Sequence, residues 1–95
     1  MGTEDSGELH IASLLVQRAP GHAAAVRAGL AGVPGAELQV EEGAKAIVTV
    51  EGASAGAIAE ALTRIQLLPG VMSAVMVFHH QEVAEREAGA EGGTR

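Results

Sequence analysis

Two stretches of this chain decide the fold: GHAAAVRAGLAGVPG at residues 21–35 and GAIAEALTRIQLLPG at residues 56–70. A shift of 35 residues superposes the triplet VPG at 33–35 on LPG at 68–70. Each stretch is amphipathic, ends in a Pro-Gly turn and precedes a β-like run, a pattern typical of a helix that leads into a strand. Two copies are too few for a solenoid, which needs at least three repeats to stack. They indicate a single sheet with two helices.

Strand-like runs flank both predicted helices. The run HIASLLVQ at His10–Gln17 is almost continuously apolar, as expected of a central strand. The run ELQVE at 37–41 alternates strictly and predicts a half-exposed edge strand. A short loop then returns the chain as AIVTVE at 46–51, and VMSAVMVFH at 71–79 is the last strand.

The predicted order of elements is therefore β-α-β-β-α-β. The first helix is expected from Gly21 to about Ala31, and the second, capped by Ser54, ends at about Gln66. Right-handed crossovers and short connections favour one α+β architecture for this order. It is the ferredoxin-like two-layer sandwich, an antiparallel four-stranded sheet with two helices on one face.

The chain of 95 residues is long enough for one domain only. Residues 1–8 are polar and acidic and are predicted to be a disordered leader. Residues 9–80 form the predicted domain, and residues 81–95 a disordered acidic tail.

Composition excludes several classes of function. The chain contains no Cys, so a disulfide framework, a thiol nucleophile and Cys-based metal sites are excluded. Phe78 is the only aromatic residue, which predicts an aliphatic core and no platform for stacking bases. A net charge of −6 disfavours nucleic acid and stable association with an anionic membrane, and favours a basic partner. Without a basic, apolar leader, the expected location is the cytoplasm.

Alternation along the strands predicts which side chains lie on the sheet face that the helices leave open. In the edge strand Leu38 and Val40 are assigned to the core, and in the last strand Met72, Ala74, Met76 and Phe78 are. Both parities of the last strand are apolar, and the repeat argues against this assignment because it superposes Val40 on Val75. The side chains assigned to the open face are Ile11, Ser13, Leu15, Gln17, Glu37, Gln39, Glu41, Ile47, Thr49, Glu51, Ser73, Val75, Val77 and His79.

The predicted open face carries an apolar strip flanked by acids. Such a patch suits a partner that is apolar and positively charged. Closure of a homodimer through the same face is the alternative.

Residues with catalytic or metal-binding chemistry are sparse. His79 and His80 are neighbours on a strand and point to opposite faces, so they cannot both bind one metal ion. The acid pair Glu41 and Glu42 lies beside a hairpin, where solvated charge is ordinary. Arg18 follows the first strand, where acylphosphatase-like enzymes need a phosphate cradle, but no convincing cradle accompanies it. We therefore expect no enzyme, no metal and no cofactor.

The sequence resembles the NapD family over about Leu9–Glu82. The segments that carry the resemblance are HIASLLVQ, VPGAELQV, IVTVEG and LPGVMSAVMVFHHQE. The ending FHHQE, similar to an aromatic–His–Gln–Glu ending in that family, is the most specific, followed by SLLVQ in the first strand.

The resemblance implies a small cytoplasmic chaperone with the ferredoxin-like fold and no catalytic motif. Such a chaperone binds the N-terminal twin-arginine signal peptide of the catalytic subunit of periplasmic nitrate reductase on its open sheet. Binding holds back export until the molybdenum cofactor and iron–sulfur cluster are inserted. A free-standing ligand-binding regulatory domain that dimerises through its sheet is the competing hypothesis, and an acylphosphatase-type enzyme is a third.

Overall fold

The computed structural model describes residues 8–83 of the chain. It contains four strands and two helices in the predicted order. Their bounds are β1 Glu8–Arg18, α1 Ala23–Leu30, β2 Ala36–Glu42, β3 Lys45–Gly52, α2 Ala55–Gln66 and β4 Val71–Val83.

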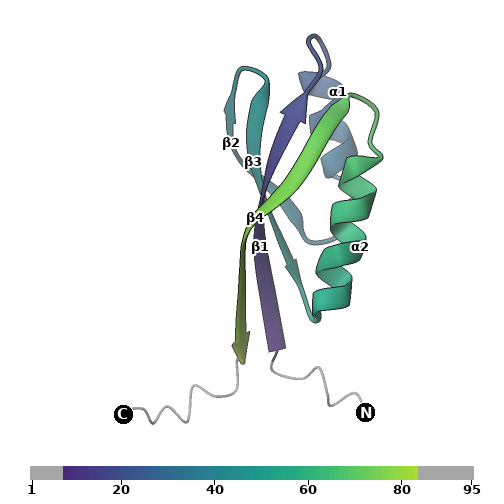
Figure 1. The fold of residues 1–95 in the computed structure, drawn as a ribbon. Coiled ribbons are helices and arrows are strands. Elements are labelled where there is room, and N and C mark those ends of the chain that lie inside the picture. The colour runs from purple at the N-terminus through teal and green to yellow at the C-terminus, as the bar shows by residue number, and fades with distance from the viewer. Residues whose placement is uncertain (1–7, 84–95) are drawn as a thin grey trace.

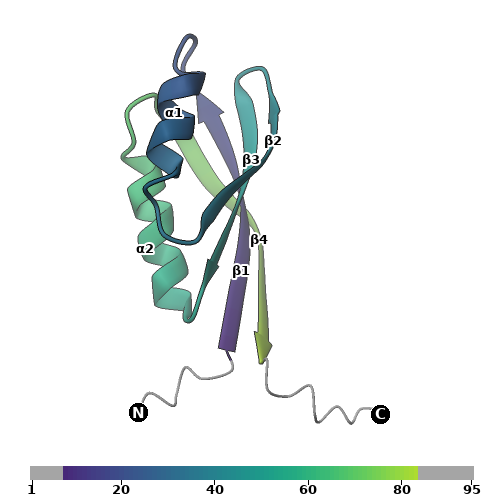
Figure 2. The same cartoon turned by 180° about the vertical axis from the view of Figure 1, so that it is seen from behind.

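The four strands form one antiparallel sheet with the order β2-β3-β1-β4. Both helices lie on the same side of this sheet, as the two opposite views show (Figures 1 and 2). The architecture is the predicted ferredoxin-like α+β sandwich. β1 is central and β2 is an edge strand, as their hydrophobic patterns indicated.

The core lies between the helices and one face of the sheet. Alternate residues of β1, from His10 to Arg18, are buried on this helix side. Because side chains alternate along a strand, the residues between them lie on the open face. The buried hydrophobic residues are all aliphatic, as predicted: Ala12, Leu14, Val16, Val26, Leu30, Val33, Ala46, Val48, Val50, Ile58, Ala61, Ile65 and Ala74.

Both Pro-Gly turns end in a glycine with a positive φ angle. Gly35 and Gly70 have φ angles of 84° and 93°, a left-handed conformation that favours glycine. A Cβ at Gly35 would overlap the carbonyl oxygen of Glu51, which shows how closely this turn approaches β3. The carbonyl oxygen of Gly35 in turn accepts a hydrogen bond of 3.0 Å from the Glu51 N–H. Ser54 caps α2 as predicted, with its Oγ accepting a hydrogen bond of 3.1 Å from the Ala57 N–H.

The ladder shifts register at three places, and each shift adds an extra residue to an edge strand. The extra residues are Gln39 in β2 and Met72 and Val77 in β4. An extra residue reverses the in–out alternation of the residues after it, because side chains alternate with a period of two. These shifts overturn part of the assignment made from the sequence.

Five assignments to a face were wrong. Val40 and Phe78, assigned to the core, pair with Ile47 and Ser13 and lie on the open face. Met72, also assigned to the core, is 67% exposed. The converse errors are Glu41, which pairs with buried Ala46, and His79, which pairs with buried Ala12; both lie on the helix side.

The ordered sheet extends past the boundaries expected from the sequence. Glu8 pairs with Val83, so β1 begins one residue before position 9 and β4 continues three residues beyond position 80. The remainder of the predicted leader and tail, residues 1–7 and 84–95, lies outside the described residues.

Candidate functional site

A continuous apolar row crosses the open face of the sheet. The pairing of neighbouring strands aligns one residue from each of the four strands: Val40, Ile47, Leu15 and Val75. Val40 and Val75, at the two ends, are each 55% exposed, and the two central residues are partly buried. We call these four residues the apolar row. The repeat superposes its two ends, Val40 and Val75, and the structure places both on the same face.

Rows of mostly polar residues border the apolar row on both sides. Toward the β2–β3 hairpin the aligned residues are Glu42, Lys45, Gln17 and Ser73. On the other side the aligned residues are Glu37, Thr49, Ser13 and Phe78. One row further on lie Glu51, Ile11 and His80. The apolar row and the mostly polar rows beside it therefore run side by side across the strands of the open face.

A shallow hollow lies at the hairpin end of the apolar row. Its volume is about 170 Å³, and it is lined by Leu15, Val40, Glu42, Lys45, Ala46 and Ile47. Val40 lines it because the extra residue Gln39 turns Val40 away from the core. The hollow is large enough for one aliphatic side chain of a partner, with charges of both signs at its rim.

Phe78, the single aromatic residue, is displayed on the open face rather than buried. It is 55% exposed, and its ring stacks on that of His80 with centroids 6.3 Å apart. The extra residue Val77, which has no partner on β1, causes this by reversing the alternation. Aromatic side chains are frequent energetic anchors in protein interfaces. Sequence reasoning missed Phe78 because both parities of this strand are apolar.

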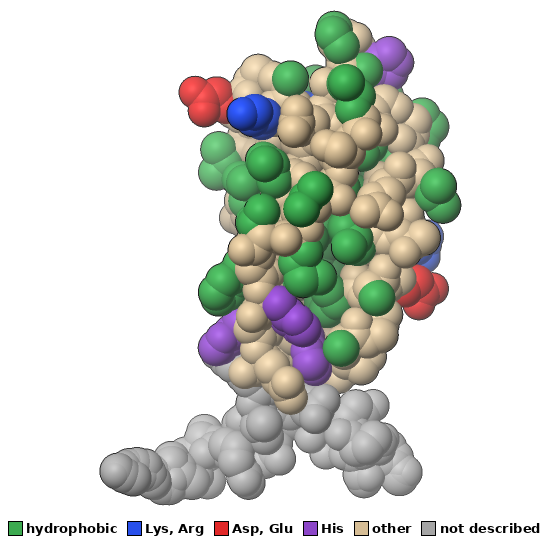
Figure 3. Space-filling model, viewed as in Figure 1, with side chains coloured by type: hydrophobic (Ala, Val, Ile, Leu, Met, Phe, Trp, Pro, Cys, Tyr) green, Lys and Arg blue, Asp and Glu red, His purple; other side chains and the backbone are tan. Residues whose placement is uncertain are grey.

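The view in Figure 3 shows how side chains are distributed on this side of the molecule. Hydrophobic side chains gather over much of it, and histidines cluster at the end where β1 begins and β4 stops, while histidine also appears at the opposite end. Acidic side chains appear only at the margins of this view. Two of the predicted acids flank the open face: Glu37 pairs with Thr49 on β3, and Glu51 pairs with Ile11 on β1. Gln39 also contributes here, because its Nε2 donates to Thr49 Oγ1 at 2.9 Å.

Glu41 belongs to an ion-pair network on the helix side. Its Oε2 accepts from Arg27 Nε of α1 at 2.8 Å and from Arg18 Nη1 at 2.7 Å. Buried Arg18 also donates from Nη2 to the Gly43 carbonyl at 2.6 Å. The guanidinium of Arg18, at the end of β1, is thus bound to the β2–β3 hairpin. The next N–H, that of Ala19, donates to the Gly70 carbonyl. This use of Arg18 differs from the phosphate cradle of an acylphosphatase.

This network predicts the acid sensitivity of the domain. The hydrogen bond from Arg27, and then that from Arg18, lower the pKa of Glu41 below its ordinary 4.5, against the opposing effect of partial burial. A lowered pKa in the folded state stabilises the fold above the unfolded pKa, and this stabilisation is lost as pH falls through the folded pKa. Glu41→Gln should therefore lower the melting temperature at pH 7 and flatten its decline below about pH 4.5.

Thermal melts between pH 7 and pH 3 measure this effect. Glu42→Gln is the matched control, because it removes the adjacent carboxylate, which lies on the open face, and should leave the acid decline in place. An acid decline in Glu41→Gln as steep as that of the unchanged chain would show that other carboxylates dominate acid unfolding.

His10 and His79 form a pair near the end of the sheet. His10 is buried, and its Nδ1 lies 2.9 Å from Nε2 of His79. One of the two nitrogens carries the proton of this hydrogen bond and the other accepts it, so the tautomers of the two rings are coupled. His79, predicted to lie on the open face, lies instead on the helix side, where it contacts His10 of β1. Among residues 8–83 no three His, Asp or Glu side chains are grouped as a metal ion would require.

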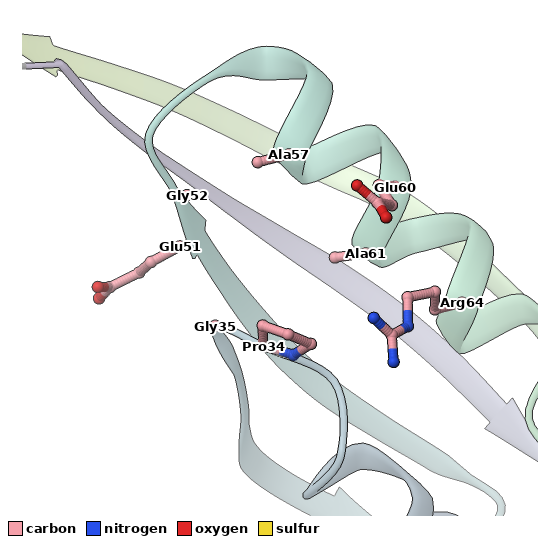
Figure 4. Close-up of a pocket in the computed structure, with 8 residues that line it drawn as sticks. All are labelled: Pro34, Gly35, Glu51, Gly52, Ala57, Glu60, Ala61 and Arg64. Atoms are coloured by element: carbon pink, nitrogen blue, oxygen red, sulfur yellow. The ribbon is translucent and has the colours of Figure 1, made fainter. Parts of the chain in front are cut away.

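A second hollow, of about 240 Å³, lies on the helix side between α2 and the turn before β2 (Figure 4). It is lined by Pro34, Gly35, Glu51, Gly52, Ala57, Glu60, Ala61 and Arg64. The Glu51 side chain points away from it, while Glu60 and Arg64 of α2 lie at its edge. Its lining offers charge but no pairing of a nucleophile with a general base.

These features define a ferredoxin-like α+β protein with one open sheet face crossed by apolar side chains. The family model for NapD protein matches residues 9–83. Chaperone NapD of Paracoccus pantotrophus is 40% identical over an alignment of 90 residues, and the match covers 90% of this chain and 80% of that protein. The chain therefore belongs to the NapD family of chaperones.

A solved structure supports the same family. The solution structure of the E. coli Tat proofreading chaperone protein NapD matches with a TM-score of 0.69 and 25% sequence identity. The match covers 92% of this chain and 90% of the E. coli chain. In the described part of this chain, neither helix has the length and apolar character needed to cross a membrane.

Proposed function

We propose that this protein binds the twin-arginine signal peptide of the catalytic subunit of periplasmic nitrate reductase, in the cytoplasm and on its open sheet face. Binding delays export until the cofactors of that subunit are inserted, and the chaperone itself catalyses no reaction. The observation that carries the proposal is the apolar row, which crosses all four strands between rows that hold acids. Membership of the NapD family supports the same proposal.

The chemistry of the two surfaces is complementary. A twin-arginine signal peptide is basic near its start and apolar beyond it. The apolar row would cover apolar side chains of the peptide, and burying such groups contributes about 25 cal/mol per Å². Glu37 and Glu51 lie outside the apolar row and would attract the arginines. A net charge of −6 on the chain favours encounter with a basic peptide.

Titration of a synthetic signal peptide into the full chain tests the proposal. We expect saturable binding at micromolar concentration or tighter, with stoichiometry of one peptide per chain. A chain that dimerises through its sheet should instead show a peptide-independent dimer in sedimentation, and an acylphosphatase should hydrolyse an acyl phosphate. Absence of peptide binding would overturn the proposal.

The expected attraction between Glu37, Glu51 and the arginines of the peptide gives a separate prediction. The double variant Glu37→Gln/Glu51→Gln should slow association and flatten its dependence on salt, because exposed charges steer encounter and are screened by ions. Stopped-flow measurements from about 20 mM to 500 mM salt follow both quantities, a range over which screening of exposed charges grows strongly. Glu60→Gln on α2 serves as control and should keep most of the salt dependence. Equal slopes for the double variant and the unchanged chain would place the arginines on other acids.

A further inference from the structure

We propose that the peptide crosses the strands along the apolar row, with its arginines over β2 and its apolar end over β4. This inference rests on the proposed function and adds to it a direction for the bound peptide. It is carried by two properties of the open face: the striping of polar and apolar rows, and the unequal charge of the two edge strands.

The striping sets the line along which the peptide lies. A peptide parallel to β1 would pass over Gln17, Leu15 and Ser13 in turn, so polar side chains would interrupt its apolar contacts. A peptide across the strands keeps to the apolar row throughout. Neighbouring strands are about 4.8 Å apart, so four strands span roughly 14 Å between their axes. A helical peptide rises about 1.5 Å per residue, so it would cross the four strands with about nine or ten residues, which is between two and three turns.

The edge strands set the direction along that line. β2 presents Glu37 and Glu42 to the open face. On β4 the residues aligned with the rows that β3 shares are Ser73, Val75, Phe78 and His80, and none of them is a carboxylate. Glu82, the acid of this strand, pairs with Leu9 beyond the last of those rows. Exposed Met72 and Val77 add further apolar surface on the same strand. The basic end of a peptide is therefore stabilised over β2 and its apolar end over β4.

Within β2, one acid is better placed than the others to meet an arginine. Glu42 pairs with Lys45, whose positive charge opposes a second cation beside it. Glu41 is on the helix side and already binds Arg18 and Arg27. Glu37 pairs with neutral Thr49, so no cation lies opposite it in its row. We assign Glu37 as the main partner of the arginine pair, with Glu51 beyond it.

Paramagnetic labelling measures the direction without altering the binding face. Two versions of the synthetic signal peptide carry a nitroxide, one just before the arginines and one after the apolar segment. Each is bound to the 15N-labelled full chain, which has no Cys of its own to react with the label. The first peptide should broaden amide signals of β2, and the second those of β4. Reduction of the nitroxide provides the diamagnetic reference.

Three outcomes overturn the direction: broadening in the opposite order, equal broadening of both edges, or broadening confined to the helices. In the first two outcomes the peptide still binds the open face, so the proposed function survives while the direction fails. Broadening confined to the helices would keep peptide binding but exclude the open face as the binding surface. If the peptide does not bind at all, the proposed function fails and the direction fails with it.

Mutation with altered peptides supplies an independent readout. Glu37→Gln should weaken binding of the normal peptide by up to about fivefold, as for an exposed ion pair. It should have little effect on a peptide whose two arginines are replaced by Gln. Val75→Ser should weaken both peptides by the same factor, because it alters only the apolar contact. If Val75→Ser and not Glu37→Gln discriminates between the peptides, the peptide runs the other way.

Discussion

Leu14→Ser is expected to abolish cooperative folding of this domain at physiological temperature. Leu14 is fully buried at the centre of β1, between Val48 on β3 and Met76 on β4. Truncation of a buried Leu costs about 2–5 kcal/mol. A buried hydroxyl without a partner adds about 1–3 kcal/mol. The sum, about 3–8 kcal/mol, overlaps the lower half of the stability expected for a domain of this size, roughly 5–14 kcal/mol.

The next residue along the strand provides the control. Leu15→Ser makes the same chemical change on the open face, where the side chain is only partly buried. It should lower the melting temperature by only a few degrees, as measured by circular dichroism. If the two variants lose the same stability, the alternation along β1 does not separate core from surface.

Loss of peptide binding is the largest functional effect that we expect. The double variant Leu15→Ser/Ile47→Ser removes the two central members of the apolar row while leaving the core and the acids intact. Each large apolar side chain contributes at most about 1.5–3 kcal/mol when fully buried, and these two are partly buried already. About 1.4 kcal/mol for each residue corresponds to roughly a hundredfold weaker binding. Isothermal titration calorimetry with the signal peptide measures this loss of affinity.

Leu67→Ser is the matched control for this prediction. Leu67 is 77% exposed at the end of α2, away from the open face, so its replacement should not alter the affinity. Folding of the double variant is checked by its amide spectrum before titration. Unchanged binding by a folded double variant would exclude the apolar row as the docking surface and direct attention to the helix side.

Phe78 and Val40 show why the predicted open face was only partly right. The set proposed from alternation includes Leu15, Ile47 and Val75, all of which the structure aligns in one row. It omits Val40 and Phe78, which lie on the same open face. It includes His79, which lies on the helix side. The errors fall on the edge strands. β1 and β3 have no extra residue, so simple alternation assigns their side chains correctly.

The order of the elements, the aliphatic core and the overall architecture could all be predicted from the sequence. These follow from local properties: the periodic apolar residues of the helices, the cap at Ser54, and the Pro-Gly turns, whose Gly35 and Gly70 adopt positive φ angles. Each depends on residues within a few positions of one another. A pattern within a single segment is therefore enough to reveal them.

The face that each edge-strand residue occupies could not be predicted from the sequence and depends on strand pairing. An extra residue in a strand, such as Gln39 or Val77, is defined by the strand it pairs with, which is distant in sequence. The same holds for the Glu41 network with Arg18 and for the contact of His10 with His79, which are 69 positions apart. The free-energy cost of reversing a side chain depends on its neighbours on other strands. An apolar run such as that of β4, equally compatible with both faces, leaves this choice to packing.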